Sequence, residues 1–329
     1  MRIYLDQNKW IDLARAATGH SGGERFAEVL KTARAAVASG EVSFPLDMYR
    51  YWETSKRGND LSRNDVADLM WELSGQQTMS PAQRILDVEL DLAFHGRFGR
   101  PEHPLQPRVF GSGLQHITGG RMAWPALNLS ALPDGGATLP DDQRLQLQSA
   151  LDEALEQKLL RAGPNDFRAA GFDRASFDLG QRYVAQENRI AAAIAKRGLK
   201  GDELDFAVRA ADLGDIRDAV VEALERIDLT WEEFIEGTTP ADLMTFMDEL
   251  PTRYVTNVMR SAKLRQAEQK WEPNDFIDIV ALPVAAVYCD VVITEKQWVH
   301  HMRQGKVGQR YDTVLLSDAA DLVNVLANV

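Results

Sequence analysis

The chain contains short, mainly apolar runs near both of its ends, at residues 3–5, 291–293 and 313–316. Runs of β-prone residues without a charged break are typical of strands buried on both faces of a parallel sheet. Elsewhere apolar residues recur mostly at helical spacing, as in the stretch 26–37. The pattern therefore predicts an α/β fold with a central, mostly parallel sheet.

The same pattern divides the chain into three parts. Residues 1–95 predict a first α/β half, with further strand candidates at 42–44 and 77–79. Residues 96–271 begin with a Gly- and Pro-rich stretch and continue as predicted helices, whereas 272–329 return to a helix-and-strand pattern. We therefore expect one α/β domain whose two halves flank a mainly α-helical insertion.

Arginines alternate with aromatic side chains in the Gly- and Pro-rich stretch. They are Arg97, Arg100, Arg108 and Arg121, interleaved with Phe98, Phe110, His116 and Trp124. These residues can bind a nucleic-acid strand through charge and stacking. Alternatively, the aromatic residues anchor an irregular, solvent-covering loop to the core. A loop of this length is uncommon unless it is functional.

Acidic residues follow or flank the predicted strands. Asp6 closes the first strand, and Asp275 and Asp278 share one face of a predicted helix that begins near residue 275. Asp290 precedes the strand 291–293, and Glu295 follows it after one threonine. Ligands bind at the carboxyl ends of parallel strands, although a lone acid there can equally be a helix cap.

The order of these residues resembles that of the PIN-domain nuclease family. The resemblance rests on Asp6-Gln7-Asn8 after the first strand, on Glu53 in an early helix, on Asp278 in a late alanine-rich helix and on a strand that ends in Thr294. It covers about residues 1–95 and 272–329. It implies a three-layer α/β/α fold and metal-dependent hydrolysis of phosphodiester bonds. RNA is the commonest substrate of such proteins, which include toxins and enzymes of RNA processing and defence.

The resemblance also implies roles for individual residues. Asp6, Glu53 and Asp278 correspond to the catalytic, metal-binding acids of the family. Its fourth acid usually stands two residues beyond the threonine, where this chain has Lys296, so either Glu295 or Asp290 is expected to replace it. Asn8 and Thr294 would orient the phosphate.

The expected cofactor is Mg²⁺ or Mn²⁺. Hard carboxylate oxygens without thiolates or paired imidazoles favour these ions over zinc. The candidate ligands are Asp6, Glu53, Asp275, Asp278, Asp290 and Glu295. The cations Arg260, Lys263, Arg265 and Lys296 are candidates for holding flanking phosphates, or are ordinary solubility charges.

Composition narrows these possibilities. The 329 residues carry a net charge of −12, which argues against broad coating of nucleic acid but leaves room for a local basic groove. The single cysteine, Cys289, excludes an intramolecular disulfide. We see no signal peptide and no apolar run long enough to span a bilayer, so a cytoplasmic protein without membrane contact is expected.

The sequence thus favours a metal-dependent endoribonuclease that takes RNA as its substrate, with a homo-oligomer or an inhibitory partner as further expectations. One alternative is a catalytically inactive PIN-like scaffold that acts through its helical insertion. Another is a haloacid-dehalogenase-like phosphohydrolase, but that family has a second Asp two residues after the first, where this chain has Asn8.

Overall fold

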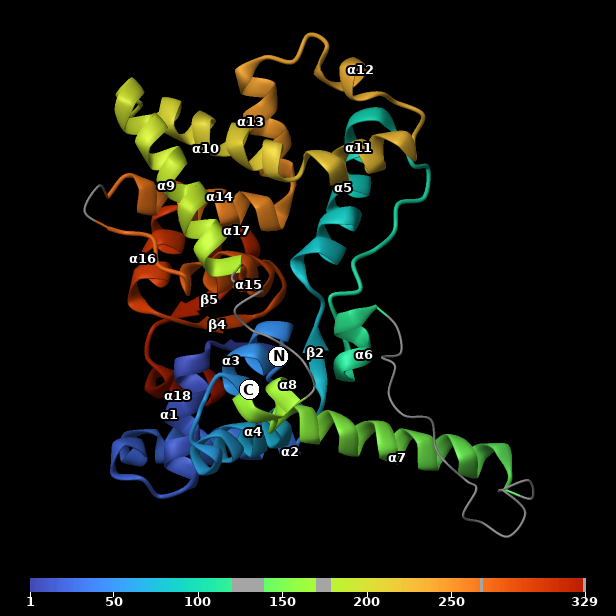
Figure 1. Cartoon of the computed structure of the whole chain (residues 1–329), viewed down its shortest axis with the longest axis vertical. Coiled ribbons are helices and arrows are strands. Elements are labelled where there is room, and N and C mark those ends of the chain that lie inside the picture. The colour runs from blue at the N-terminus through green and yellow to red at the C-terminus, as the bar shows by residue number, and fades with distance from the viewer. Residues whose placement is uncertain (120–138, 170–178, 267–268, 328–329) are drawn as a thin grey trace. The chain divides into compact units, whose positions relative to one another are not determined.

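The computed structural model describes residues 1–119, 139–169, 179–266 and 269–327 (Figure 1). It divides into two compact units. The first unit comprises Met1–Asp6, Ser80–Val109 and Asp173–Val325, as far as these are described. The second comprises Gln7–Met79, Phe110–Phe172 and Leu326–Val329 with the same restriction. The protein is mostly helical and contains a small parallel sheet.

The parallel sheet lies in the first unit and has the strand order β1-β4-β5. Its strands are β1 (Ile3–Leu5), β4 (Val291–Ile293) and β5 (Val314–Leu316). Leu5 pairs with Ile293, and Ile293 pairs with Leu316, so the three strands end together. Strands β1 and β4 are fully buried, as apolar runs in a parallel sheet should be. All three predicted strands near the chain ends are therefore confirmed.

Helices make up the rest of the first unit. They are α5 (Ala82–Phe98), α9 (Leu179–Arg197), α10 (Asp202–Asp215), α11 (Arg217–Glu225), α12 (Trp231–Ile235), α13 (Pro240–Glu249), α14 (Pro251–Leu264), α15 (Asp275–Tyr288), α16 (Lys296–Gln304) and α17 (Val307–Tyr311), followed by the 3₁₀ turn η3 (Ala319–Asp321). Helix α18 (Leu322–Leu326) is the last described helix. Helix α14 packs against α10, α13, α15 and α16, and α16 packs on β5 (Figure 1).

The helices expected to form an insertion do not form a separate unit. Helices α9 and α10 lie in the unit that contains α15, because α9 packs on α15 and α10 packs on α14. The buried residues Val208 of α10, Phe246 of α13 and Met259 of α14 show that apolar faces of these helices are covered within the unit. The boundary expected near residue 271 is therefore not where the structure divides.

The second unit combines helices with a two-stranded antiparallel sheet. Its elements are α1 (Gln7–Ala17), the 3₁₀ helix η1 (Ser21–Phe26), α2 (Ala27–Ala38), α3 (Met48–Ser55), α4 (Asp60–Ser74), β2 (Gln77–Met79), β3 (Phe110–Ser112), α6 (Gly113–Thr118), α7 (Asp141–Leu160) and α8 (Pro164–Ala169). The stretch 42–44, predicted to be a strand, contains only a bridge residue, Ser43, and is not a full strand. Leu46 forms an isolated parallel bridge with Thr78. Pro45 has no N–H to donate to a ladder, and Asp47 then caps α3.

Glu89 of α5 caps the N-terminus of α14 from outside that helix. Both of its carboxylate oxygens lie 3.1 Å from the Thr252 backbone nitrogen, and the Thr252 hydroxyl donates to Oε2 at 2.7 Å. The Tyr288 hydroxyl donates to Oε1 at 3.0 Å. This arrangement satisfies a backbone donor at the helix end that would otherwise lack a partner.

Burial raises the pKa of Glu89 to about 7, although hydrogen bonds from Thr252 and Tyr288 and the charge of Arg253 oppose the shift. Because the folded-state pKa lies above the unfolded value, the folded protein binds more protons between about pH 4.5 and 7. We expect this carboxyl to make the free energy of unfolding fall by about 1–3 kcal/mol as pH rises through that window. Urea denaturation of wild type and Glu89→Gln at pH 5 and 7.5 measures this change in the free energy of unfolding. Equal pH dependence in the two proteins would contradict this prediction.

Candidate functional site

Asp6 and Thr294 meet at the carboxyl edge of the parallel sheet. The Asp6 backbone N–H donates to the Ile293 carbonyl at 3.0 Å, and the Thr294 N–H donates to the Leu316 carbonyl at 3.1 Å. The Thr294 hydroxyl donates to Asp6 Oδ2 at 3.1 Å. Asp6 is 5% exposed and Thr294 is fully buried. The parallel register therefore holds one carboxylate at the strand ends, with a hydroxyl fixing its orientation.

Asp278 is tied to the segment that begins at Thr294. It lies in the first turn of α15 and is half-buried. The Trp298 indole N–H donates to Asp278 Oδ2 at 2.8 Å. Trp298 stands four positions after Thr294, in α16, so the segment from the end of β4 into α16 contacts both acids. The structure thus connects Asp6 and Asp278 through one short stretch of chain.

Asp275 is paired with a lysine of the same unit. Lys263 Nζ, from α14, donates to Asp275 Oδ2 at 2.7 Å, and the Glu272 backbone N–H donates to the same oxygen at 2.5 Å. The ammonium also lies 4.9 Å from the ring centroid of Trp271 and 5.3 Å from that of Trp298. Ring faces attract a cation, so Lys263 is held by one carboxylate and two indoles.

A cavity of about 500 Å³ lies beside this ion pair. Lys263, Asp275 and Glu295 line it together with the exposed residues Lys270 and Lys296. Glu295 is half-buried and stands at the N-terminus of α16, where its side chain makes no capping hydrogen bond. The cavity therefore combines acidic and basic groups next to the strand ends.

His301 packs behind this cluster and is uncharged at neutral pH. Its ring is 5.6 Å from that of Trp298 in an edge contact, and its Nε2 lies 3.2 Å from the Gln266 side-chain nitrogen. Burial lowers the pKa of His301 to about 4, and the positive charges of His300 and Lys263 lower it further. His301 therefore supports the indole of Trp298 and carries no charge of its own.

Asp290 does not belong to this site. It precedes β4, and Asp6 follows β1, so in a parallel pair the two residues stand at opposite edges of the sheet. Asp290 Oδ2 instead accepts a hydrogen bond from the Arg2 backbone N–H at 2.5 Å. The expectation that Asp290 could supply the fourth acid beside Asp6 is therefore wrong, and of the two alternatives only Glu295 lies at the carboxyl edge.

The two predicted phosphate-binding arginines, Arg260 and Arg265, are engaged elsewhere in the first unit. Arg260 is 2% exposed; its guanidinium lies 2.7 Å from Glu187 Oε1 and 3.0 Å from Asp212 Oδ1. Arg265 pairs with Asp205 at 2.5 Å on the surface. Arg260 therefore cannot reach a phosphate, because it points into the interface of α14 with α9 and α10.

Glu53 and Asn8 belong to the second unit. Glu53 lies in α3, where the buried Arg50 guanidinium approaches its Oε2 to 2.8 Å. Asn8 lies in the first turn of α1 and is exposed. Two members of the basic and aromatic mixture, Arg121 and Trp124, lie outside the described residues. The candidate site at the carboxyl edge of the β1-β4-β5 sheet therefore consists of first-unit residues.

Sequence reasoning missed the two tryptophans that organise the site. Trp271 and Trp298 are both buried, and each contacts a charged group. A buried indole needs a partner for its N–H, and that requirement was the one available signal for Trp298. Nothing in the local sequence indicated that an acid on a different helix would be the acceptor.

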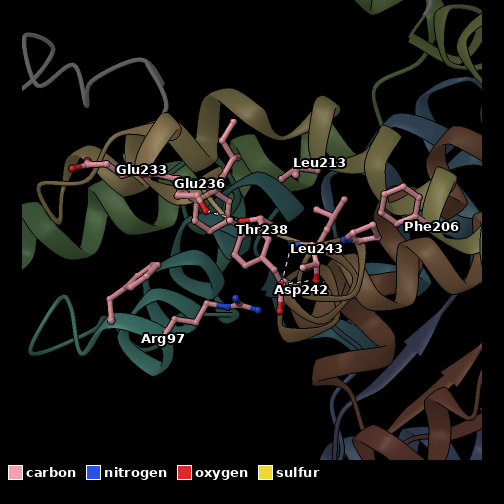
Figure 2. Close-up of a pocket in the computed structure, with 15 residues that line it drawn as sticks. Arg97, Phe206, Leu213, Glu233, Glu236, Thr238, Asp242 and Leu243 are labelled. Atoms are coloured by element: carbon pink, nitrogen blue, oxygen red, sulfur yellow. Dashed lines mark hydrogen bonds between the residues drawn. The ribbon is translucent and has the colours of Figure 1, made fainter.

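A separate cavity of about 510 Å³ lies among helices of the first unit, as Figure 2 shows. It is formed by α5, α10, α12 and α13 and is mainly aromatic and aliphatic. Its lining includes Arg97, Phe98, Phe206, Leu213, Phe234, Leu243 and Phe246. Two of its acids are used in capping boxes: Asp242 accepts from Thr239, and Glu233 accepts from Thr230. Such a cavity suits binding of an apolar group.

Within the described part of the chain, no group of three or more His, Cys, Asp and Glu side chains is close enough to hold a metal ion. No described helix is long and apolar enough to cross a membrane. Comparisons with protein-family models, curated proteins and solved structures gave no match.

Proposed function

We propose that this protein is a metal-dependent endoribonuclease whose site lies at the carboxyl edge of the β1-β4-β5 sheet. One observation supports the proposal most directly: Asp6 and Asp278 are both bonded to the segment from Thr294 to Trp298. Two acids that approach a sheet edge from different elements are what a carboxylate metal site requires. The three-layer, PIN-like arrangement is part of the same proposal and rests on the sequence resemblance.

Asp6 and Asp278 fit Mg²⁺ or Mn²⁺ in chemistry. Mg²⁺ usually keeps several waters and takes one or two protein carboxylates together with substrate phosphates. A site with fewer than three acidic ligands already in place is therefore compatible with the coordination of Mg²⁺. Glu295, which lines the adjacent cavity, would be the additional acid. When bound, the ion would activate a water molecule and stabilise charge on the scissile phosphate.

The remaining residues would bind and orient the substrate. Thr294 fixes the Asp6 carboxylate, and Trp298 fixes that of Asp278. Lys270 and Lys296 stand exposed at the cavity and would attract the phosphate backbone in an otherwise acidic protein. RNA as substrate, a role as a toxin or in RNA processing or defence, and control by self-association or an inhibitory partner are proposed on the resemblance. A cytoplasmic location suits the buried free thiol of Cys289.

Cleavage of labelled single-stranded RNA and DNA by the purified protein tests this function. We expect RNA to be cut internally with Mg²⁺ or Mn²⁺ and to remain intact with EDTA, because the acids need a cation to act on a phosphodiester. A metal added back after EDTA should restore cleavage. Cutting that is equally fast in EDTA would rule out the metal-dependent mechanism, and no cutting of either nucleic acid would remove the nuclease proposal.

A second candidate function is that of a binding protein. The cavity of Figure 2 supports it, since Phe98 and Ile235, which line this cavity, are each 43% exposed. Exposed apolar side chains that gather at one cavity are typical of a binding surface. This function would become the favoured one if the protein neither cleaves nucleic acid nor binds a divalent ion.

A further inference from the structure

The charge of Asp275 is matched by a lysine inside the protein. The Lys263 and Asp275 side chains are only 4% and 5% exposed, and their charged atoms are 2.7 Å apart. The pair is therefore shielded from water, unlike a surface salt bridge. A buried carboxylate with such a partner does not need a second cation.

The surroundings of Lys263 favour a cation at this position. The rings of Trp271 and Trp298 both lie within the range of a cation–π interaction from the ammonium. Trp271 is held in turn by an edge contact with Tyr183, at 5.5 Å between ring centroids. A metal ion that took Oδ2 of Asp275 would have to displace Lys263 from that oxygen and from both rings.

We propose that Lys263 is the resident cation of Asp275, so that Asp275 is not a metal ligand and any divalent ion binds at Asp6 and Asp278. The indole of Trp298 contacts Lys263 and also donates its N–H to Asp278. Lys263 is therefore a positioning residue, which acts on Asp278 through Trp298. This inference rests on the proposed function only for the statement that a divalent ion binds. The assignment of Lys263 to Asp275 stands on the contacts themselves.

Titration with Tb³⁺, followed by luminescence excited through tryptophan, tests the inference without substrate. Tb³⁺ binds carboxylate oxygens, and Trp271 and Trp298 are close enough to Asp275 to sensitise an ion bound there. The variants are Lys263→Gln, Asp275→Asn and the double variant, with circular dichroism to confirm folding. Asp278→Asn is the matched control, since it changes an acid of the same helix from carboxylate to amide.

We expect Asp275→Asn to bind Tb³⁺ as wild type does, whereas Asp278→Asn binds about tenfold more weakly or worse. Lys263→Gln should gain tryptophan-sensitised Tb³⁺ luminescence, because it exposes an unmatched carboxylate beside two indoles. The double variant should lose that gain. A folded Asp275→Asn protein with about tenfold weaker binding would overturn the inference, as would a folded Lys263→Gln protein without the gain.

The same titration separates this inference from the proposed function. If wild type binds no Tb³⁺ and cleaves nothing, the nuclease proposal fails, but a gain in Lys263→Gln that Asp275→Asn removes still supports the resident cation. If Lys263→Gln does not fold, Asp275→Asn decides alone. If neither single variant folds, the double variant decides: binding as in wild type supports the inference, and weaker binding overturns it.

Discussion

Asp278→Asn is expected to lower kcat/KM for RNA cleavage by about a hundredfold or more, because a bound metal contributes several kcal/mol of transition-state stabilisation. The substitution removes the negative charge but leaves a side-chain oxygen that can still accept the Trp298 N–H now bonded to Asp278. The half-buried position makes a large change in folding stability unexpected. Initial rates on labelled single-stranded RNA over a range of Mg²⁺ concentrations measure the effect. Asp6→Asn should lower kcat/KM by a similar factor and remain folded, since the Thr294 hydroxyl can donate to the new amide oxygen.

Asp290→Asn provides the matched control. Asp290 flanks the same strand, β4, but stands at the opposite edge of the sheet and bonds the Arg2 backbone. Its substitution should leave cleavage within about twofold of wild type, which is the usual range for a surface site away from the chemistry. Equal losses in Asp278→Asn and Asp290→Asn would show that the activity depends on the integrity of the sheet, and not on a site at its carboxyl edge.

The strands could be predicted from the sequence, and with them part of the site. Residues 3–5 and 291–293 are wholly apolar, so their burial in a parallel sheet follows from local pattern alone. Once the strands are parallel, Asp6 and Thr294 must stand at the same edge, and the structure joins them. The same rule applied to Asp290 would have excluded it, because a residue before a strand cannot share the edge of a residue after one.

The partners of charged helix residues could not be predicted in this way. Arg260 and Lys263 both belong to a basic stretch that suggests a solvated or phosphate-binding face. In the structure both are buried, and the acids that match Arg260 lie on α9 and α10, 73 and 48 residues away in sequence. Helical periodicity indicates which residues share a face, but it does not indicate which element covers that face.

Arg260→Met is expected to lower the free energy of unfolding by about 3–5 kcal/mol, which is the cost of removing one partner from a buried ion pair. Arg260 bonds Glu187 and Asp212, and both of these acids are fully buried. Burial raises the pKa of Glu187 even with Arg260 in place. Burial also acts to raise the pKa of Asp212, but Arg253 and Arg260 together hold it below its usual value. Methionine would fill the space and leave Glu187 without its cation. Urea denaturation followed by circular dichroism measures the change.

Arg265→Met separates burial from charge in this prediction. Arg265 is the residue at the C-terminal end of α14, and its carboxylate partner, Asp205, lies in α10, the helix that also supplies Asp212. Its side chain is 46% exposed, so its ion pair is screened by water and should contribute only about 0–1 kcal/mol. If the two variants were equally destabilised, the cost would come from losing a positive charge on α14. A cost confined to Arg260→Met would show that the buried acids of α9 and α10 need this guanidinium to stay charged inside the protein.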